Sequence, residues 1–153
     1  MRSTDFPPID QIIYHRGEVL LLDDVIEHDD SHTIAGVDLS KKKWLQRSDG
    51  TTPGWIALEY MAQCIGVHEG LYSYLHNRDL HGGFLISVID LEIHVREFAA
   101  DLQLRVHTRP MRGRPGLGAL SHECSIYSAV EPSSGSLLAR GRLSIFIGPS
   151  LQD

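Results

Sequence analysis

The sequence contains only two cysteines, no long apolar segment and no excess of basic residues, and each of these absences excludes a class of protein. Cys64 and Cys124 lie in apolar segments without metal-ligand spacing, which favours reduced core thiols over a disulfide. No run of about 18 apolar residues is present, so we expect no membrane-spanning helix. The net charge of −6 argues against a nucleic-acid-binding protein.

Other signals that would place the chain in a special class are also weak. Residues 1–8 lack the apolar region of a signal peptide, so we expect a cytoplasmic protein. The nine histidines are scattered, without an HExxH-like pair and without a nearby cysteine in zinc-ligand spacing. We therefore expect neither a metal site nor a cofactor. His28 and His32 flank an Asp-Asp-Ser turn, and we expect both to be solvated.

A chain of 153 residues with 42% hydrophobic residues is long enough for one domain with its own core, so we expect a single domain over residues 1–153. The order of apolar and turn-forming segments predicts two strands, one long helix and four further strands. The expected strands cover residues 17–26, 33–39, 84–95, 102–108, 117–130 and 137–147, and the expected helix begins at Pro53 and ends at His76 or Asn77.

The segment around Glu59 carries the most functional information. Glu59 and Gln63 are four residues apart, so they share one face of the helix. Apolar residues surround that face on nearly every other side, which predicts a buried helix. A buried carboxylate costs several kcal/mol unless it is paired or neutralised. Either Glu59 is a satisfied structural residue, or the polar and small edge of Gln63, Gly66 and Gly70 lets a ligand or another surface approach the backbone.

This order of elements predicts an α+β protein with a hot-dog fold. A curved antiparallel sheet wrapped around the helix is the economical way to bury a helix that is apolar nearly all round. A single sheet covers only part of such a helix, so we expect a second subunit to cover the rest. The ligand site is then expected at the subunit boundary of a dimer.

The chain resembles the β-hydroxyacyl-acyl-carrier-protein dehydratases of hot-dog fold, nearest to the branch found in aryl polyene biosynthesis. The helix segment carries the most specific part of the resemblance, with Pro53-Gly54, Glu59 and Met61-Ala62-Gln63 in matching positions. Weaker similarities occur in the opening strand, in the strand after the helix and in the last strand, at residues 15–25, 84–90 and 139–143.

The resemblance implies a syn elimination of water from a β-hydroxyacyl thioester, with a histidine as base and a helix carboxylate as acid. Glu59 matches the carboxylate, and burial would favour the neutral form that donates the proton. Gly54 matches a glycine whose amide polarises the thioester carbonyl, and Gln63 matches a glutamine that positions the carboxylate. Candidate walls of a substrate tunnel are Trp55, Phe84 and Leu85.

The family's catalytic histidine has no counterpart in this sequence. Its position, eight residues before Pro53, is occupied by Leu45, and no histidine occurs between His32 and His68. Asp49 and His15 are the possible substitutes for the base. We therefore expect the chain alone to be a poor dehydratase, unless a histidine-containing paralogous partner completes the site.

Three functions remain open from the sequence. The chain could act as a dehydratase on acyl-carrier-protein thioesters, in a homodimer or in a heterodimer with a paralogous hot-dog protein. It could be a thioesterase in which Glu59 activates water, or a non-catalytic acyl-binding subunit. Basic loop residues are either ordinary solvated charges or a docking surface for an acidic carrier protein, namely Lys41, Lys42, Lys43, Arg47, Arg112 and Arg114.

Overall fold

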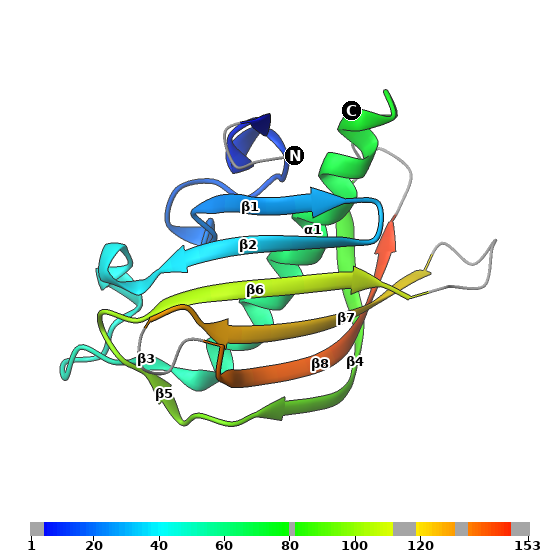
Figure 1. Ribbon diagram of the computed structural model, residues 1–153. Coiled ribbons are helices and arrows are strands. Elements are labelled where there is room, and N and C mark those ends of the chain that lie inside the picture. Colours follow the sequence, from blue (N-terminus) through cyan, green and yellow to red (C-terminus); the bar gives the residue numbers. More distant parts are fainter. Residues whose placement is uncertain (1–4, 80–81, 112–118, 131–134, 148–153) are drawn as a thin grey trace.

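A curved antiparallel sheet wraps around one long helix in the computed structural model (Figure 1). The structure describes residues 5–79, 82–111, 119–130 and 135–147. The helix is α1 (Ala57–Leu75), and the six-stranded sheet has the order β1-β2-β6-β7-β8-β4. Its strands are β1 (Asp24–Asp29), β2 (His32–Asp38), β4 (Gly83–Ile93), β6 (Gln103–Pro110), β7 (Ala119–Ser128) and β8 (Leu137–Ile147). This arrangement confirms the α+β hot-dog prediction.

The core lies between α1 and the concave face of the sheet. Alternate residues of β6, such as Leu104 and Val106, are buried, as expected for a strand with one face on the core. From α1, Met61 and Ile65 are fully buried against this sheet. Both cysteines are buried and free, which confirms the prediction of reduced core thiols. Among the described residues, no helix is long and apolar enough to cross a membrane.

The helix begins later than the sequence predicts. Thr52–Pro53 forms the short strand β3, which pairs with β5 (Glu97–Phe98), and a 3₁₀ turn at Gly54–Ile56 leads into α1. The Gly54 N–H donates a hydrogen bond to the Arg96 carbonyl at 2.9 Å, so this part of the chain is held by the β3–β5 pair. A Cβ atom at Gly54 would lie 2.3 Å from the Val95 carbonyl oxygen, so the close approach of the two segments requires glycine here.

The first predicted strand also differs from the structure. Residues Gly17–Val19 form a 3₁₀ turn and β1 begins only at Asp24, whereas β2 matches its predicted range within one residue. Gly17 has φ +57°, a backbone conformation that ends an extended segment and favours glycine. Residues 117 and 118 of another predicted strand lie outside the described residues.

The small-residue edge of α1 receives the N-terminal segment of the same chain. A Cβ atom at Gly70 would lie 2.6 Å from Ile12 Cγ2 and 2.7 Å from the Ile12 carbonyl oxygen. Gly66 lies beside Ile13, and both isoleucines are buried. The edge thus permits a close backbone approach, and part of it is covered by residues that precede the sheet.

Candidate functional site

A cavity of about 460 Å³ lies between α1, the N-terminal segment and β4. Its walls are largely apolar, with two carboxylates, one amide and one imidazole among them. The residues that bear on its chemistry are Glu59, Gln63, Glu69, His15, Phe84 and Leu85. Five of these six residues were predicted from the sequence as catalytic or substrate-binding candidates. Glu69 was not predicted.

Glu59 and His15 meet at this cavity from segments that are far apart in the sequence. Glu59 Oε1 lies 3.6 Å from His15 Nε2 and accepts a hydrogen bond from Gln63 Nε2 at 2.9 Å. The two side chains are 46% and 41% exposed. The expectation that Glu59 is buried is therefore wrong for the single chain, because the sheet covers the opposite side of α1 and leaves this edge open.

Gln63 holds the site together. Its amide nitrogen also donates to the Val19 carbonyl at 2.7 Å, and its amide oxygen accepts from the Leu21 N–H at 2.9 Å. Because the side chain is 1% exposed, each of these polar atoms depends on its partner in the protein. Gln63 consequently fixes the segment before β1 against α1 and orients Glu59 towards the cavity.

Two of the expected substrate-binding residues do not line the cavity. Trp55 is 67% exposed and is absent from the described lining residues, so its expected place in the wall is wrong for the single chain. The Gly54 N–H is already bonded to the Arg96 carbonyl, so in this conformation it does not point at a thioester. Phe84 and Leu85 do form part of the wall.

The two possible substitutes for the base lie in different environments. Asp49 is exposed and is absent from the described lining of the cavity. Its carboxylate accepts hydrogen bonds from the hydroxyl and N–H of Thr51, which lower its pKa and thus its basicity. His15 lines the cavity beside Glu59. The geometry therefore brings only His15, of these two, to the carboxylate.

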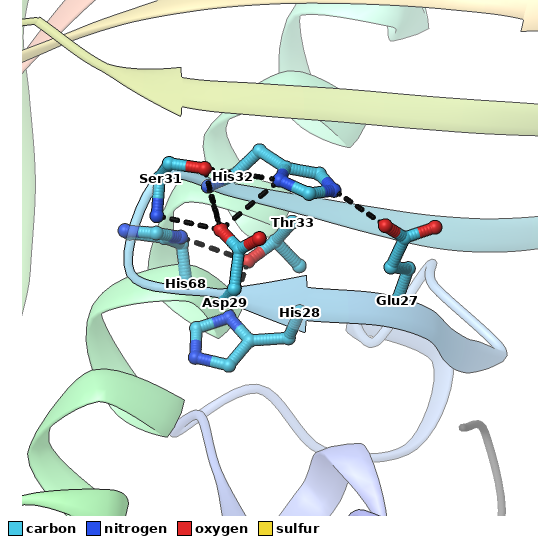
Figure 2. Close-up of polar contacts among 7 residues, drawn as sticks. All are labelled: Glu27, His28, Asp29, Ser31, His32, Thr33 and His68. Atoms are coloured by element: carbon cyan, nitrogen blue, oxygen red, sulfur yellow. Dashed lines mark hydrogen bonds and ion pairs between the residues drawn. The ribbon is translucent and has the colours of Figure 1, made fainter. Parts of the chain in front are cut away.

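A buried polar cluster was missed from the sequence. His28 Nδ1 lies 2.7 Å from Thr33 Oγ1, which also contacts His68 Nδ1 at 2.8 Å (Figure 2). His122 Nε2 lies 2.9 Å from Glu69 Oε1 at the cavity wall. His28 is 3% exposed, so the expectation that it is solvated is wrong. No local sequence pattern predicts this cluster, because its members come from four separate elements, namely β1, β2, α1 and β7.

Burial determines the charge of these histidines. Burial lowers the pKa of His68 to about 4, and the nearby Glu69 carboxylate only partly opposes this shift. Burial also lowers the pKa of His28, against the opposing effect of Asp29. Both rings are therefore neutral near pH 7.

Comparison with known proteins agrees with this architecture. The family described as "ApeP-like: ApeP dehydratase" matches residues 7–153. The structure is similar to the dehydratase heterocomplex ApeI:P from Xenorhabdus doucetiae, with a TM-score of 0.84, 26% identity, and coverage of 94% of this chain and 93% of that one. No curated protein sequence matches the chain significantly.

More distant structural neighbours share the fold alone. A hypothetical thioesterase with coenzyme A from Streptococcus pneumoniae TIGR4 has a TM-score of 0.59 at 11% identity, over 84% of this chain and 87% of that one. The protein smu.793 from Streptococcus mutans UA159, bound to acetyl CoA, has a TM-score of 0.55 at 8% identity, over 84% and 90% of the two chains. The family match over residues 7–153 confirms the resemblance to hot-dog dehydratases, and the chain belongs to the ApeP-like dehydratase family.

Proposed function

We propose that this chain is one subunit of a dehydratase that eliminates water from β-hydroxyacyl thioesters of an acyl carrier protein. The observation that carries the proposal is the position of Glu59, held by Gln63 and 3.6 Å from His15, at an apolar cavity that the single chain leaves open. A carboxylate and an imidazole at one site can divide the acid and base steps of an elimination.

In the proposed reaction a base removes the proton from C2 of the acyl chain while Glu59 protonates the C3 hydroxyl. The C–O bond breaks, water leaves, and the C2–H bonding electrons form the double bond. Glu59 is half-exposed here, and a partner and the substrate would exclude water from it when they cover the cavity. A histidine of a paralogous partner supplies the main base in this proposal, and His15 is the base available within the chain.

The free edge of the sheet supports the need for a partner. β4 is the last strand in the sheet order, and its other edge has no strand beside it among the described residues. Its exposed apolar side chains are Phe84, Leu85, Ile86, Val88 and Ile89. An exposed apolar edge strand is a site for pairing with another chain. A hot-dog partner on β4 would cover Phe84 and Leu85 and close the cavity, and the similarity to a dehydratase heterocomplex supports a paralogue there.

The proposed docking surface for the carrier protein is smaller than the sequence indicated. Lys41, Lys43 and Arg47 are exposed. Lys42 is buried, with its Nζ atom 2.6 Å from Asp23 Oδ1, so its expected place on a docking surface is wrong. Arg112 and Arg114 lie outside the described residues. Long-range attraction by the three exposed cations would increase the association rate with an acidic carrier protein.

A reconstitution assay tests this proposal. The purified chain, alone and with a histidine-containing hot-dog paralogue, is incubated with a β-hydroxyacyl carrier-protein thioester, and loss of water is followed by mass spectrometry. We expect the chain alone to be slower than the complex by about 10²–10⁴-fold, the usual worth of general acid–base assistance. Glu59→Gln should lower the rate of the complex by a similar factor, whereas the exposed control Glu18→Gln should not.

Other outcomes have distinct meanings. Hydrolysis of the thioester without loss of water would support the thioesterase alternative. Tight binding of the acyl chain and full activity of the Glu59→Gln complex would support a non-catalytic subunit. Full activity of the chain alone would refute the missing-base argument, and His15→Ala and Asp49→Asn would then identify the base.

A further inference from the structure

We infer that His68, Glu69 and His122 form a binding site for a divalent transition-metal ion of the zinc class. The ligand atoms of these three side chains lie within 4.8 Å of one another, and His122 Nε2 and Glu69 Oε1 are already 2.9 Å apart. Small movements of the side chains bring such atoms to the separations of tetrahedral zinc ligands, which lie about 2.0–2.2 Å from the metal. Two imidazoles and one carboxylate are a common zinc ligand set.

Burial supports the inference. His68 is 2% exposed and His122 is fully buried, so the surrounding protein holds both imidazoles in place, as it does the histidine ligands of a buried metal site. Of the three proposed ligands, Glu69 is the one accessible to solvent, because its side chain is 21% exposed and lines the cavity. Glu69 therefore connects the buried cluster to the cavity.

Hydrogen bonds around the cluster orient one ligand. Thr33 Oγ1 has one proton but contacts two imidazole nitrogens, Nδ1 of His28 and Nδ1 of His68, so at least one of those nitrogens carries the proton and donates. If His68 Nδ1 donates, its Nε2 atom has a free lone pair. Figure 2 shows the second nitrogen of His68 on the side away from Thr33. A second partner that fixes the tautomer is the usual support of a metal-bound histidine.

The hydrogen bonds within the protein do not satisfy the cluster completely. His122 Nδ1 and His28 Nε2 are buried and have no hydrogen-bond partner among the described residues. His122 Nδ1 lies on the other edge of the ring from the Nε2 atom that faces Glu69, so it stays available for a second partner such as a buried water when Nε2 binds an ion.

The proposed metal site lies at the same cavity as Glu59 but further along α1. Glu69 follows Glu59 by ten residues on α1, which places it about 15 Å further along the helix axis. The ion would connect α1 to β7, which carries His122, and through Thr33 to β2. We assign it a stabilising role, since a metal that binds only the folded chain stabilises that state.

Metal binding by the tag-free, chelator-treated chain tests the inference. Titration with Co²⁺ should give the visible absorption of a four-coordinate site, and calorimetry with Zn²⁺ should give one tight equivalent per chain with a raised unfolding temperature. Glu69→Gln keeps the size of the side chain and a partner for His122, and should weaken the tight Zn²⁺ binding at least about tenfold. His122→Gln should have the same effect.

A matched control separates this site from adventitious binding by surface histidines. His94 Nε2 lies 3.2 Å from Glu92 Oε2 at an exposed position. His94→Gln therefore removes a similar histidine–glutamate pair, and it should leave the tight binding of one Zn²⁺ per chain unchanged. The inference is overturned if no saturable binding occurs, or if folded Glu69→Gln binds as tightly as the original chain. Circular dichroism of each variant confirms folding, and metal binding is measured without substrate, so the result does not depend on the proposed dehydratase activity.

Discussion

The Gln63 side chain joins three parts of the molecule at the cavity, because its amide contacts Val19, Leu21 and Glu59. Both amide protons and the amide oxygen are used, so no apolar residue of similar size can replace it without leaving buried backbone groups unpaired. The same residue thus stabilises the fold and orients the proposed acid.

Gln63→Leu tests this double role. The substitution leaves the Val19 carbonyl and the Leu21 N–H without their partner, so we expect the free energy of unfolding to fall by about 2 kcal/mol or more. Urea denaturation measures this change. Gln11→Leu, at an exposed position, is the control and should change stability little. An unchanged unfolding midpoint for Gln63→Leu would contradict the structural part of the role.

The lowered pKa of His68 predicts how the free energy of unfolding depends on pH. Its pKa is about 4 in the folded chain and 6.5 in the unfolded chain, so between these values only the unfolded state takes up the proton. Stability therefore falls as the pH is lowered from about 6.5 to about 4, by up to about 3 kcal/mol from this residue. Denaturation in chelator at a series of pH values measures the slope. A folded His68→Asn variant should lose stability less steeply, and an equal slope would exclude His68 as its source.

At the scale of elements, the contact between α1 and the N-terminal segment depends on Gly70. Alanine normally stabilises a helix by about 1 kcal/mol over glycine. At Gly70, however, a Cβ atom would lie 2.6 Å from Ile12 Cγ2 and 2.7 Å from the Ile12 carbonyl oxygen. We expect Gly70→Ala to lower the unfolding temperature.

Gly66→Ala is the matched control in the same helix. The Cβ atom at Gly66 would meet only Ile13 Cγ2, at 3.4 Å, which is an ordinary contact. The higher helix propensity of alanine then outweighs any steric cost, and the unfolding temperature should stay equal or rise. If both variants are stabilised alike, the N-terminal segment does not pack on α1 as the structure shows.

The loop between β2 and β3 carries the proposed docking surface. Replacing Lys41 and Lys43 by alanine should slow association with the carrier protein and reduce the dependence of the rate on salt, because rim charges act mainly on encounter. Stopped-flow measurements at low and high salt detect this. The control is Arg78→Ala, at an exposed position just after α1. Equal rates for the lysine variant and the control at low salt would count against docking at this loop.

At the scale of the whole molecule, the free edge of β4 predicts how subunits assemble. Ile86 and Val88 are exposed on β4 and lie outside the described cavity lining. A lysine at either position would place an unpaired charge in an apolar interface, so Ile86→Lys should weaken assembly at least about 100-fold, which corresponds to about 3 kcal/mol. Light scattering over a concentration series measures it. Tyr74→Lys, exposed at the end of α1, should assemble normally, and an unchanged Ile86→Lys complex would move the interface away from β4.

The sequence by itself determined the features that depend on local periodicity. The apolar pattern of residues 55–75 predicted the long helix, which the structure places at Ala57–Leu75, and the alternation in residues 102–108 predicted a strand with one face on the core. The four-residue spacing placed Glu59 and Gln63 on one face because the helix period fixes it. The motif around Pro53 and Gly54 indicated the family, although the β3–β5 pair delayed the start of the helix.

Tertiary structure alone decided the contacts between segments far apart in the chain. His15 meets Glu59 across 44 residues and His122 meets Glu69 across 53, and no local pattern encodes either meeting. Glu59 is half-exposed because the curved sheet covers the other side of α1, which depends on how helix and sheet pack and not on the composition of the helix. Local periodicity selects the elements and their buried faces, whereas strand register and packing determine which side chains share a site.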